Sequence, residues 1–269
     1  MQFHLWYVRV PFVPHQKCYN LYVQPQYGWS DSMETHKATI SEAVRMRGET
    51  DRIVSPLWML APLLGIVVLI VMMILGLLIS PEAMILFTFA GFIITIVIAV
   101  YPLYLLIKRR SAHFRRDATL RSGIVEYLKA RAASQNVNIS SEVATMNVVH
   151  SESLGEEREK SAVMWTILSV IVPFVGIYVL YFLTKDPPNH DHRQLAFMQQ
   201  AQSATSKLGM TIVVPTWKSL PDRSFFLYFI LTIVTFGLFG IYWYYVLFKD
   251  FNEHFKAQWV FEDQLVSTI

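Results

Sequence analysis

The sequence predicts an all-α integral membrane protein, and three observations lead to that prediction. The chain of 269 residues is 54% hydrophobic and only 16% charged, whereas an ordinary soluble domain carries about 25% charged residues. A short phrase containing two tyrosines, a lysine and a histidine occurs three times, each time where an apolar run ends. A helix needs about 20 apolar residues to cross the hydrocarbon core, so we expect about four membrane helices. They are the four runs without Asp, Glu, Lys, Arg or His: 57–79, 83–107, 162–184 and 225–248.

The first two runs form a predicted hairpin. The turn between them, Ser80 to Glu82, contains no Lys or Arg, whereas 33–56 contains four and 108–160 contains ten. Lys and Arg gather on the cytoplasmic side of membrane proteins, so this turn faces outward and both hairpin ends face the cytoplasm. We expect a prokaryotic cytoplasmic membrane, with the N-terminus and the C-terminus both in the cytoplasm.

The third and fourth runs leave two topologies open. If each crosses the membrane once, the five Lys and Arg residues of 185–224 lie on the outer side, against the charge bias. If each is a re-entrant wedge broken at Pro173 or at Gly237 and Gly240, every basic segment stays cytoplasmic. Half-helices of about 12 residues rise about 18 Å, and the turn between them needs protein or water around it. Simple spans are the commoner arrangement, and Pro and Gly are frequent in them.

The repeated phrase divides the chain into three degenerate repeats. Its copies run from Ala99 to His113, from Gly176 to His190 and from Gly240 to His254. We place the repeats at 33–136, 137–210 and 211–269, the first of them a helical hairpin followed by an amphipathic helix. Residues 1–32 stand apart, with eight aromatic residues and a single acid, Asp31. They are either an aromatic arm that binds a partner or the bilayer surface, or a segment upstream of a true start at Met33.

Each repeat continues into a predicted amphipathic helix beginning near its histidine. Apolar residues follow each histidine by seven and by eleven positions, which is one face of a helix. The longest such helix covers about 111–134. Its basic face suits anionic headgroups, at about 1 kcal/mol per well-placed Lys or Arg, or it is solvated while the helix packs on the sister repeats. Pro187 and Pro188 are expected to end the helix that leaves the third run, and the Gln-, Ser- and Ala-rich 199–206 is expected to be helical.

Short β-like phrases separate the helices from the next runs. They lie at 38–41, 137–140 and 210–214, and we expect them to pair into a small sheet.

Aromatic, lysine and histidine side chains at the run exits are the predicted lipid contacts. A ring with a polar tip suits the headgroup boundary. The predicted contacts are Tyr101, Tyr104, Lys108, His113, Tyr178, Tyr181, Lys185, His190, Tyr242, Trp243, Tyr245, Lys249 and His254. The three histidines are the most specific of these. A histidine just past a helix exit more often caps carbonyls or meets headgroups than binds metal, so we predict no metal ligand. The polar turn from Asp186 to His192 is a weaker candidate for a divalent metal, because its ligand spacing is loose.

Several function classes are excluded or disfavoured. Ion-coupled transporters and proton pumps need charged residues within the membrane, and the four runs have none. The sequence contains no Walker loop, GxGxxG, GxSxG or HExxH motif, so we expect neither an enzyme nor a cofactor. Cys18 is the only cysteine, which rules out a disulfide or a thiolate metal site within the chain. The basic 108–131 segment lies beside a predicted membrane, so it does not indicate nucleic-acid binding.

The segment from Leu231 to Asn252 resembles a family of prokaryotic membrane proteins. That family carries a signature close to T-x-G-I-Y-x-x-Y-W-x-Y…D-x-N and is described as a domain of unknown function. The resemblance is good over 224–254, partial over 161–190, where the Trp is missing, and faint over 99–114. It implies a small helical membrane domain with no established activity, and it transfers no catalytic residue.

These observations favour a non-catalytic membrane scaffold or an accessory subunit of a larger membrane complex. Its partners would be the bilayer, anionic lipid headgroups, and other membrane subunits or further copies of itself. A second interpretation is an uncoupled channel or small-molecule permease, with the wedges as its constriction. A third is a quinone- or lipid-binding subunit that uses the tyrosine and histidine exits.

Overall fold

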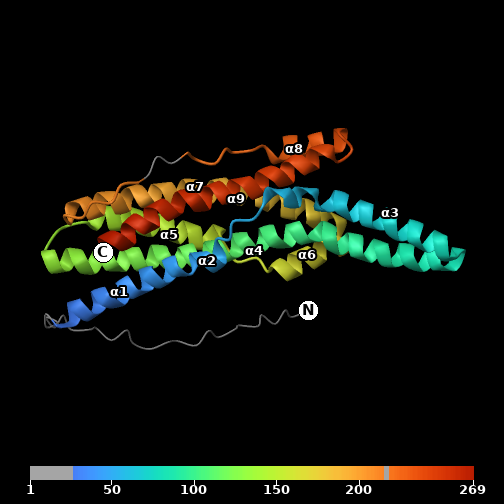
Figure 1. Cartoon of the computed structure of the whole chain (residues 1–269). Helices are drawn as coiled ribbons and strands as arrows, with labels where there is room; N and C mark the ends of the chain where they lie inside the picture. The colour runs from blue at the N-terminus through green and yellow to red at the C-terminus, as the bar shows by residue number, and fades with distance from the viewer. Residues whose placement is uncertain (1–26, 215–217) are drawn as a thin grey trace, which may run out of the picture.

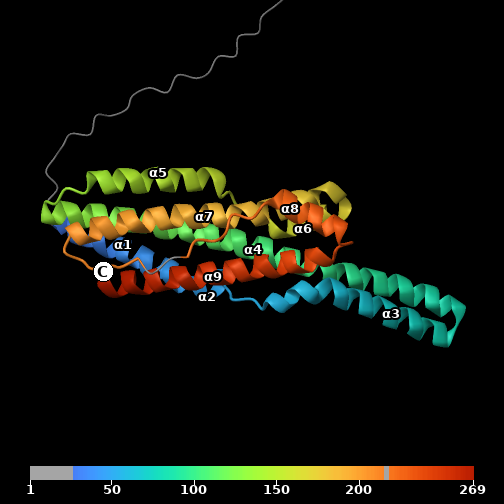
Figure 2. The same ribbon diagram turned by 90° about the horizontal axis from the view of Figure 1, so that it is seen from above.

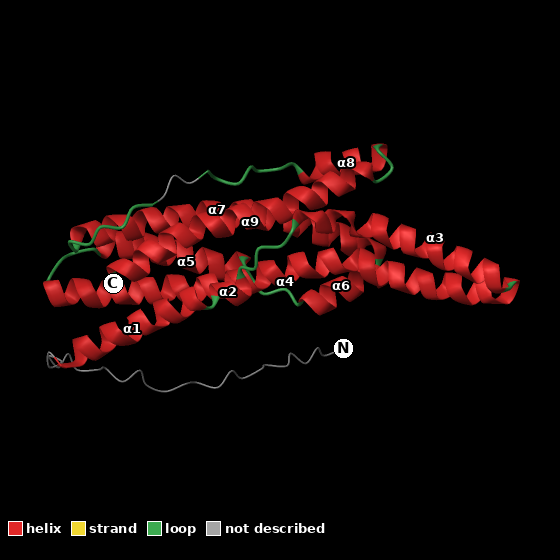
Figure 3. Ribbon diagram, viewed as in Figure 1, coloured by secondary structure: helices red, strands yellow, loops and turns green. Residues whose placement is uncertain are grey.

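The computed structural model describes residues 27–214 and 218–269, and all of its regular structure there is helical (Figure 3). No strand occurs in those two ranges, so the predicted small sheet is wrong. Residues 38–41 lie inside a helix. Residues 210–214 form a loop in which two amides bond side chains: Val213 N–H donates to Gln264 Oε1 at 3.0 Å, and Val214 N–H donates to Gln202 Oε1 at 3.4 Å.

Figure 1 shows the helices, labelled in their order along the chain. Residues 1–26 of the predicted aromatic arm lie outside the described residues, and the first helix has Met33 in its interior. The elements are α1 (Tyr27–Arg45), α2 (Arg47–Thr50), the 3-10 helix η1 (Pro56–Leu60), α3 (Ala61–Ile79), α4 (Pro81–Gln135), α5 (Ser140–Glu156), α6 (Ala162–Ile171), α7 (Pro173–Lys207), α8 (Phe225–Val234) and α9 (Leu238–Thr268).

Three of the helices are long, and each follows a shorter apolar helix across a tight turn. The pairs are α3 with α4, α6 with α7, and α8 with α9. A serine caps the start of each apolar segment: Ser55, Ser161 and Ser224 accept a backbone N–H two or three residues on. Figures 1 and 2 show α6 and α8 at the same end of the bundle as the α3–α4 pair, which projects farther than either.

The α3–α4 pair contains two helices long and apolar enough to cross a membrane, Pro56–Ile79 and Pro81–Gln135. Their apolar side chains face outward; Leu78 is 78% exposed and Ile85 is 70% exposed. The two helices approach closely at Gly76, where an added Cβ would lie 2.5 Å from the Cα of Met84.

The third and fourth runs are not the single helices of the four-span prediction; each is broken near the residue that the re-entrant alternative named, Pro173 or Gly237. Val172 is extended (φ −120°, ψ 103°) and separates α6 from α7, because the residue before a proline is disfavoured in the helical region. In the fourth run Phe236 and Gly237 have φ of 50° and 90°, and this left-handed turn separates α8 from α9. Both α6 and α8 have 10 residues. They rise about 15 Å, which is half of what a crossing needs.

Helix α7 continues through Pro187 and Pro188, so the prediction that they end it was wrong. Each proline removes one helical hydrogen bond. Tertiary contacts on both sides of the pair hold the segment in place: Asp186 bonds Arg110 of α4, and His190 contacts His113 of α4. The 199–206 segment is helical, as predicted.

The long helices α4, α7 and α9 run parallel and bury two apolar clusters. The hairpin-side cluster contains Leu106, Leu183 and Leu247, which lie seven residues before the three histidines. The tail-side cluster contains Leu120, Phe197 and Phe261, which lie seven residues after them. A spacing of seven keeps residues on one helix face, which confirms the predicted apolar faces of the three tails. The histidines therefore lie between the two clusters.

Candidate metal centre

Three histidines from three helices meet in the interior of the bundle. His113 of α4, His190 of α7 and His254 of α9 form a tri-histidine cluster, and their exposed fractions are 0%, 0% and 3%. His113 Nε2 lies 3.1 Å from His190 Nε2 and 3.1 Å from His254 Nε2. The ring centroids of His190 and His254 lie 5.0 Å apart. Their three ligand-type atoms all lie within 4.8 Å of one another.

A carboxylate holds the outer nitrogen of each ring. His113 Nδ1 lies 3.0 Å from Asp51 Oδ1, His190 Nδ1 lies 3.0 Å from Glu157 Oε1, and His254 Nδ1 lies 2.7 Å from Asp191 Oδ1. A carboxylate accepts hydrogen bonds, so these neighbours favour the tautomer in which Nδ1 carries the proton. Each Nε2 then presents a lone pair to the centre of the cluster. Lone pairs that converge at this distance repel one another unless a cation lies between them.

Burial favours the neutral form of His113 and of His190. It lowers the pKa of His113 to about 4, against the opposing effect of Asp51, and it lowers the pKa of His190 despite the nearby Glu157. Burial alone would raise the pKa of Asp51, but His113 and Arg116 outweigh it and hold that pKa well below its usual range. Neutral imidazoles with ionised partners behind them are the form in which histidine binds a metal.

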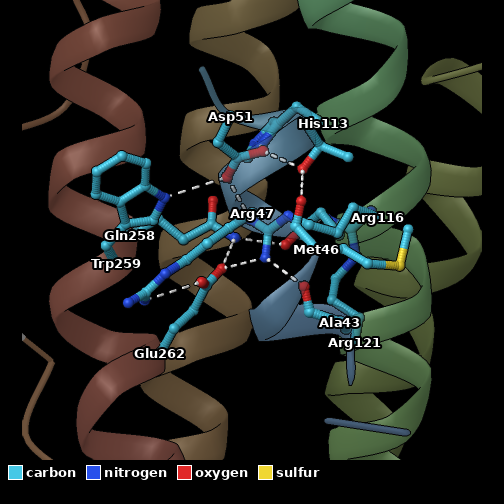
Figure 4. A network of polar contacts seen from close by, with 12 residues as sticks. Ala43, Met46, Arg47, Asp51, His113, Arg116, Arg121, Gln258, Trp259 and Glu262 are labelled. Carbon is cyan, nitrogen blue, oxygen red and sulfur yellow. Dashed lines mark hydrogen bonds and ion pairs between the residues drawn. The ribbon is translucent and has the colours of Figure 1, made fainter. Parts of the chain in front are cut away.

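The carboxylate of Asp51 belongs to a buried polar network (Figure 4). Arg116 Nη2 donates to Asp51 Oδ2 at 2.6 Å, and Arg116 Nη1 donates to Glu262 Oε1 at 2.7 Å. Trp259 Nε1 also donates to Asp51 Oδ2, at 3.3 Å. These bonds fix the carboxylate of Asp51, which in turn orients the ring of His113.

A second polar layer lies one helical turn beyond the histidines. Its members follow the histidines by four positions and are all buried: Asp117, Gln194 and Gln258. Gln258 Nε2 donates to Asp117 Oδ1 at 2.8 Å. Arg121 pairs with Asp117 and donates to Gln194 Oε1 at 3.2 Å. This layer bonds largely within itself and separates the tri-histidine cluster from the tail-side cluster.

The structure divides the predicted lipid contacts into two groups. Most reach the surface at least in part: Tyr101, Tyr104, Lys108, Tyr178, Tyr181, Lys185, Tyr242, Tyr245 and Lys249. Trp243 is buried and donates from Nε1 to Thr184 Oγ1 at 3.0 Å. The tri-histidine cluster is buried as well, because its helix faces turn toward the bundle axis. These four side chains are therefore not the surface contacts that we expected.

The carboxylates of this site were not among the residues that we predicted from the sequence. Asp51 and Glu157 stand just ahead of the serines that cap η1 and α6, so the same short segments start an apolar helix and orient a histidine. Of the polar turn from Asp186 to His192, only His190 joins the cluster as a ligand-type side chain; Asp191 bonds His254 instead. The signal available was the recurrence of an acid and an Arg before each apolar run.

Residues 223–262 match a sequence family described as a domain of unknown function (DUF4234). The matched segment contains α8 and the part of α9 with Asp250 and His254. No curated protein and no solved structure matches the chain.

Proposed function

We propose that this protein is a non-catalytic membrane scaffold whose three helix pairs are repeats of one unit, joined at their histidines by one divalent transition-metal ion. The observation that carries the proposal is the convergence of three carboxylate-backed imidazole nitrogens from α4, α7 and α9. Each repeat supplies one ligand, so the ion ties together segments that are far apart along the chain.

The spacing of the nitrogens suits a zinc-sized ion. Zinc binds imidazole nitrogen at about 2.0–2.1 Å, so three such nitrogens on a tetrahedron lie about 3.3 Å apart. The separations of 3.1 Å from His113 are close to that value. Imidazole also suits copper, nickel and iron, and zinc is the first candidate because both separations from His113 Nε2 are close to its tetrahedral value.

A structural role agrees with the position of the cluster. It lies between two apolar clusters and its rings are buried. An ion that binds the folded chain and not the unfolded one adds its binding free energy to stability. We propose that the ion holds the three tails in register beneath the membrane helices, where they present a surface to other subunits or to further copies.

We propose that the membrane-embedded part of the protein consists of two spans and two short re-entrant hairpins. The α3–α4 pair crosses, while α6 and α8 enter with the first turns of α7 and α9 and return. Their length and their common end of the bundle support this topology. All the Lys and Arg segments then lie on the cytoplasmic side, as the charge bias favours.

Metal analysis tests the proposal. Wild-type protein purified in detergent is expected to hold about one ion per chain by plasma mass spectrometry. His113→Asn should lower this below about a tenth, and so should His190→Asn. His192→Asn is the matched control, because His192 is exposed on the same turn as His190. A wild-type protein that binds neither zinc, cobalt, nickel, iron nor copper would overturn the proposal.

Cysteine labelling tests the topology. Ser206 is the second-last residue of α7 and Ser267 the second-last residue of α9, and both are exposed. Each is changed to Cys in a Cys18→Ser background, and intact cells are treated with a membrane-impermeant maleimide. Both sites should be shielded until the cells are opened. Labelling of position 206 alone in intact cells would show that the third run crosses.

A further inference from the structure

One position of the repeat carries a cation in one long helix and an acid in the other two. Four residues before each histidine stand Arg109 in α4, Asp186 in α7 and Asp250 in α9. Both aspartates bind an arginine. Asp186 Oδ2 lies 2.5 Å from Arg110 Nη2, and Asp250 Oδ2 lies 3.0 Å from Arg223 Nη1.

In the first repeat, two cations stand where the third repeat has the ion pair of Arg223 with Asp250. Arg223 follows Asp222 ahead of α8, and Arg52 follows Asp51 at the matching place ahead of η1. The counterparts of Arg223 and Asp250 are therefore Arg52 and Arg109, which are both cations. No ion pair of Arg52 occurs within residues 27–214 and 218–269.

Arg109 has hydrogen-bond donors left over. It is only 4% exposed, and its Nη2 donates to Asn252 Oδ1 at 2.6 Å. Its Nε and Nη1 are buried and have no hydrogen-bond partner among the described residues. A buried guanidinium with unused donors is costly unless an acceptor reaches it.

Arg52 and Arg109 line the same cavity, which has a volume of about 300 Å³. Lys108 is a third cation on its wall, and Glu49 is the one acid among the described residues that line it. The negative charge of Asp51 attracts Arg109. The oxygens of Asp51, however, already accept bonds from His113 and Arg116. The cavity therefore has an excess of positive charge that the other repeats neutralise with an aspartate.

We propose that this cavity binds the phosphate of an anionic phospholipid. The phosphate takes the place that the Asp250 carboxylate holds in the third repeat, and arginine suits it because its planar fork binds two phosphate oxygens. The wall toward α3 is aromatic, with the rings of Trp58 and Tyr101 4.8 Å apart. An apolar cavity of about 230 Å³ adjoins it at Trp58 and is lined by Leu57, Leu60 and Leu64. This second cavity suits an acyl chain, so we assign the site to a lipid and not to a soluble anion.

The test replaces the cation by the residue of the sister repeats. Arg109→Asp lets position 109 pair with Arg52 as Asp250 pairs with Arg223. The detergent-purified full chain is delipidated and titrated with short-chain phosphatidylglycerol, and native mass spectrometry counts bound lipid. Affinity should fall at least tenfold in Arg109→Asp. Lys249→Ala is the matched control, because Lys249 holds in α9 the place of Lys108 and pairs with Glu253; its affinity should equal that of wild type.

Two further measurements keep the outcome clear. The double variant Arg52→Gln, Lys108→Gln changes only exposed side chains and should also weaken binding at least tenfold, whether or not Arg109→Asp folds. Short-chain phosphatidylcholine should bind at least tenfold more weakly than phosphatidylglycerol. If Arg109→Asp and the double variant both bind phosphatidylglycerol as tightly as wild type, the proposed lipid site is wrong. Binding of inorganic phosphate as tight as that of the lipid would overturn its assignment to a lipid.

Discussion

The two halves of helix α4 differ in the side chains that they expose and bury. In its N-terminal half the exposed side chains are apolar, with Ile85 70% and Leu86 66% exposed. In its C-terminal half the buried side chains include charged ones: Arg110, Arg116 and Asp117 are each exposed by no more than 2%. The comparison shows that one continuous helix is built for two surroundings. Its first half exposes apolar side chains, and its second half keeps charges inside because oppositely charged side chains pair with them.

The apolar segments differ in length between the helix pairs, whereas the long helices share one spacing around their histidines. α3 has 19 residues, whereas α6 and α8 have 10 each. All three long helices nevertheless bring a leucine, a histidine and a further apolar residue to matching levels. The proposed function accounts for this difference, because a bilayer accepts hairpins of different depth whereas the ligands of a metal ion must hold fixed positions.

The largest expected effect comes from breaking the buried charge network. Arg116→Ala leaves the carboxylates of Asp51 and Glu262 without their main cation, and such a change costs about 3–5 kcal/mol. Urea unfolding of chelator-treated protein in detergent measures this. The neighbouring Arg115→Ala should cost less than about 1 kcal/mol, because its partner Glu159 is 60% exposed. Equal losses in the two variants would contradict the contrast between the buried and the exposed pair.

A second change acts on metal affinity through a residue that is not a ligand. Asp191→Asn removes the charge that orients His254, and loss of such a partner typically lowers metal affinity 10- to 100-fold. Competition with a chromogenic zinc chelator measures the affinity. Asp222→Asn breaks an exposed pair with Lys185 and should leave it unchanged. An affinity equal to that of wild type in Asp191→Asn would show that the carboxylate does not act on the ion.

The apolar half is tested by crowding the closest approach of α3 and α4. Gly76→Ala puts a Cβ 2.5 Å from the backbone of Met84, and overpacking of this kind costs about 1–3 kcal/mol. Thermal unfolding in detergent, followed by circular dichroism, detects the loss. Gly155→Ala has nothing within 4 Å and should be neutral or slightly stabilising. A fully stable Gly76→Ala protein would show that the two helices can separate without cost.

The smallest expected effect is a difference in surroundings between two spin-labelled positions, one of them in the α8–α9 turn. Phe236 is 98% exposed at that turn, and Val213 is 53% exposed in the loop after α7. Each is changed to Cys in a Cys18→Ser background and carries a nitroxide label in liposomes. We expect the label at 236 to collide more with oxygen than with a water-soluble nickel chelate, and the label at 213 to show the reverse. The same preference at both positions would contradict the hairpin topology.

Much of the fold follows from the sequence, because long uncharged runs and apolar faces are local patterns. The breaks at Val172 and Gly237 were visible as Pro173 and Gly237, but these residues occur in kinked spans as well as in turns. Pro187 and Pro188 were misread because a local rule was applied where contacts with α4 hold the helix. The histidines were found as a repeated motif, yet their burial depends on the parallel packing of three helices. Leu106, Leu183 and Leu247, seven residues before them, were the unused sign that each histidine lies on a buried face.

The central claim is that one metal ion joins the three repeats at their histidines. X-ray absorption spectroscopy of the zinc-loaded protein in detergent tests it most directly. We predict three imidazole nitrogens at about 2.0–2.1 Å, with the imidazole scattering reduced by about a third in His254→Ala. A spectrum without imidazole scattering, or one that His254→Ala leaves unchanged, would contradict the account.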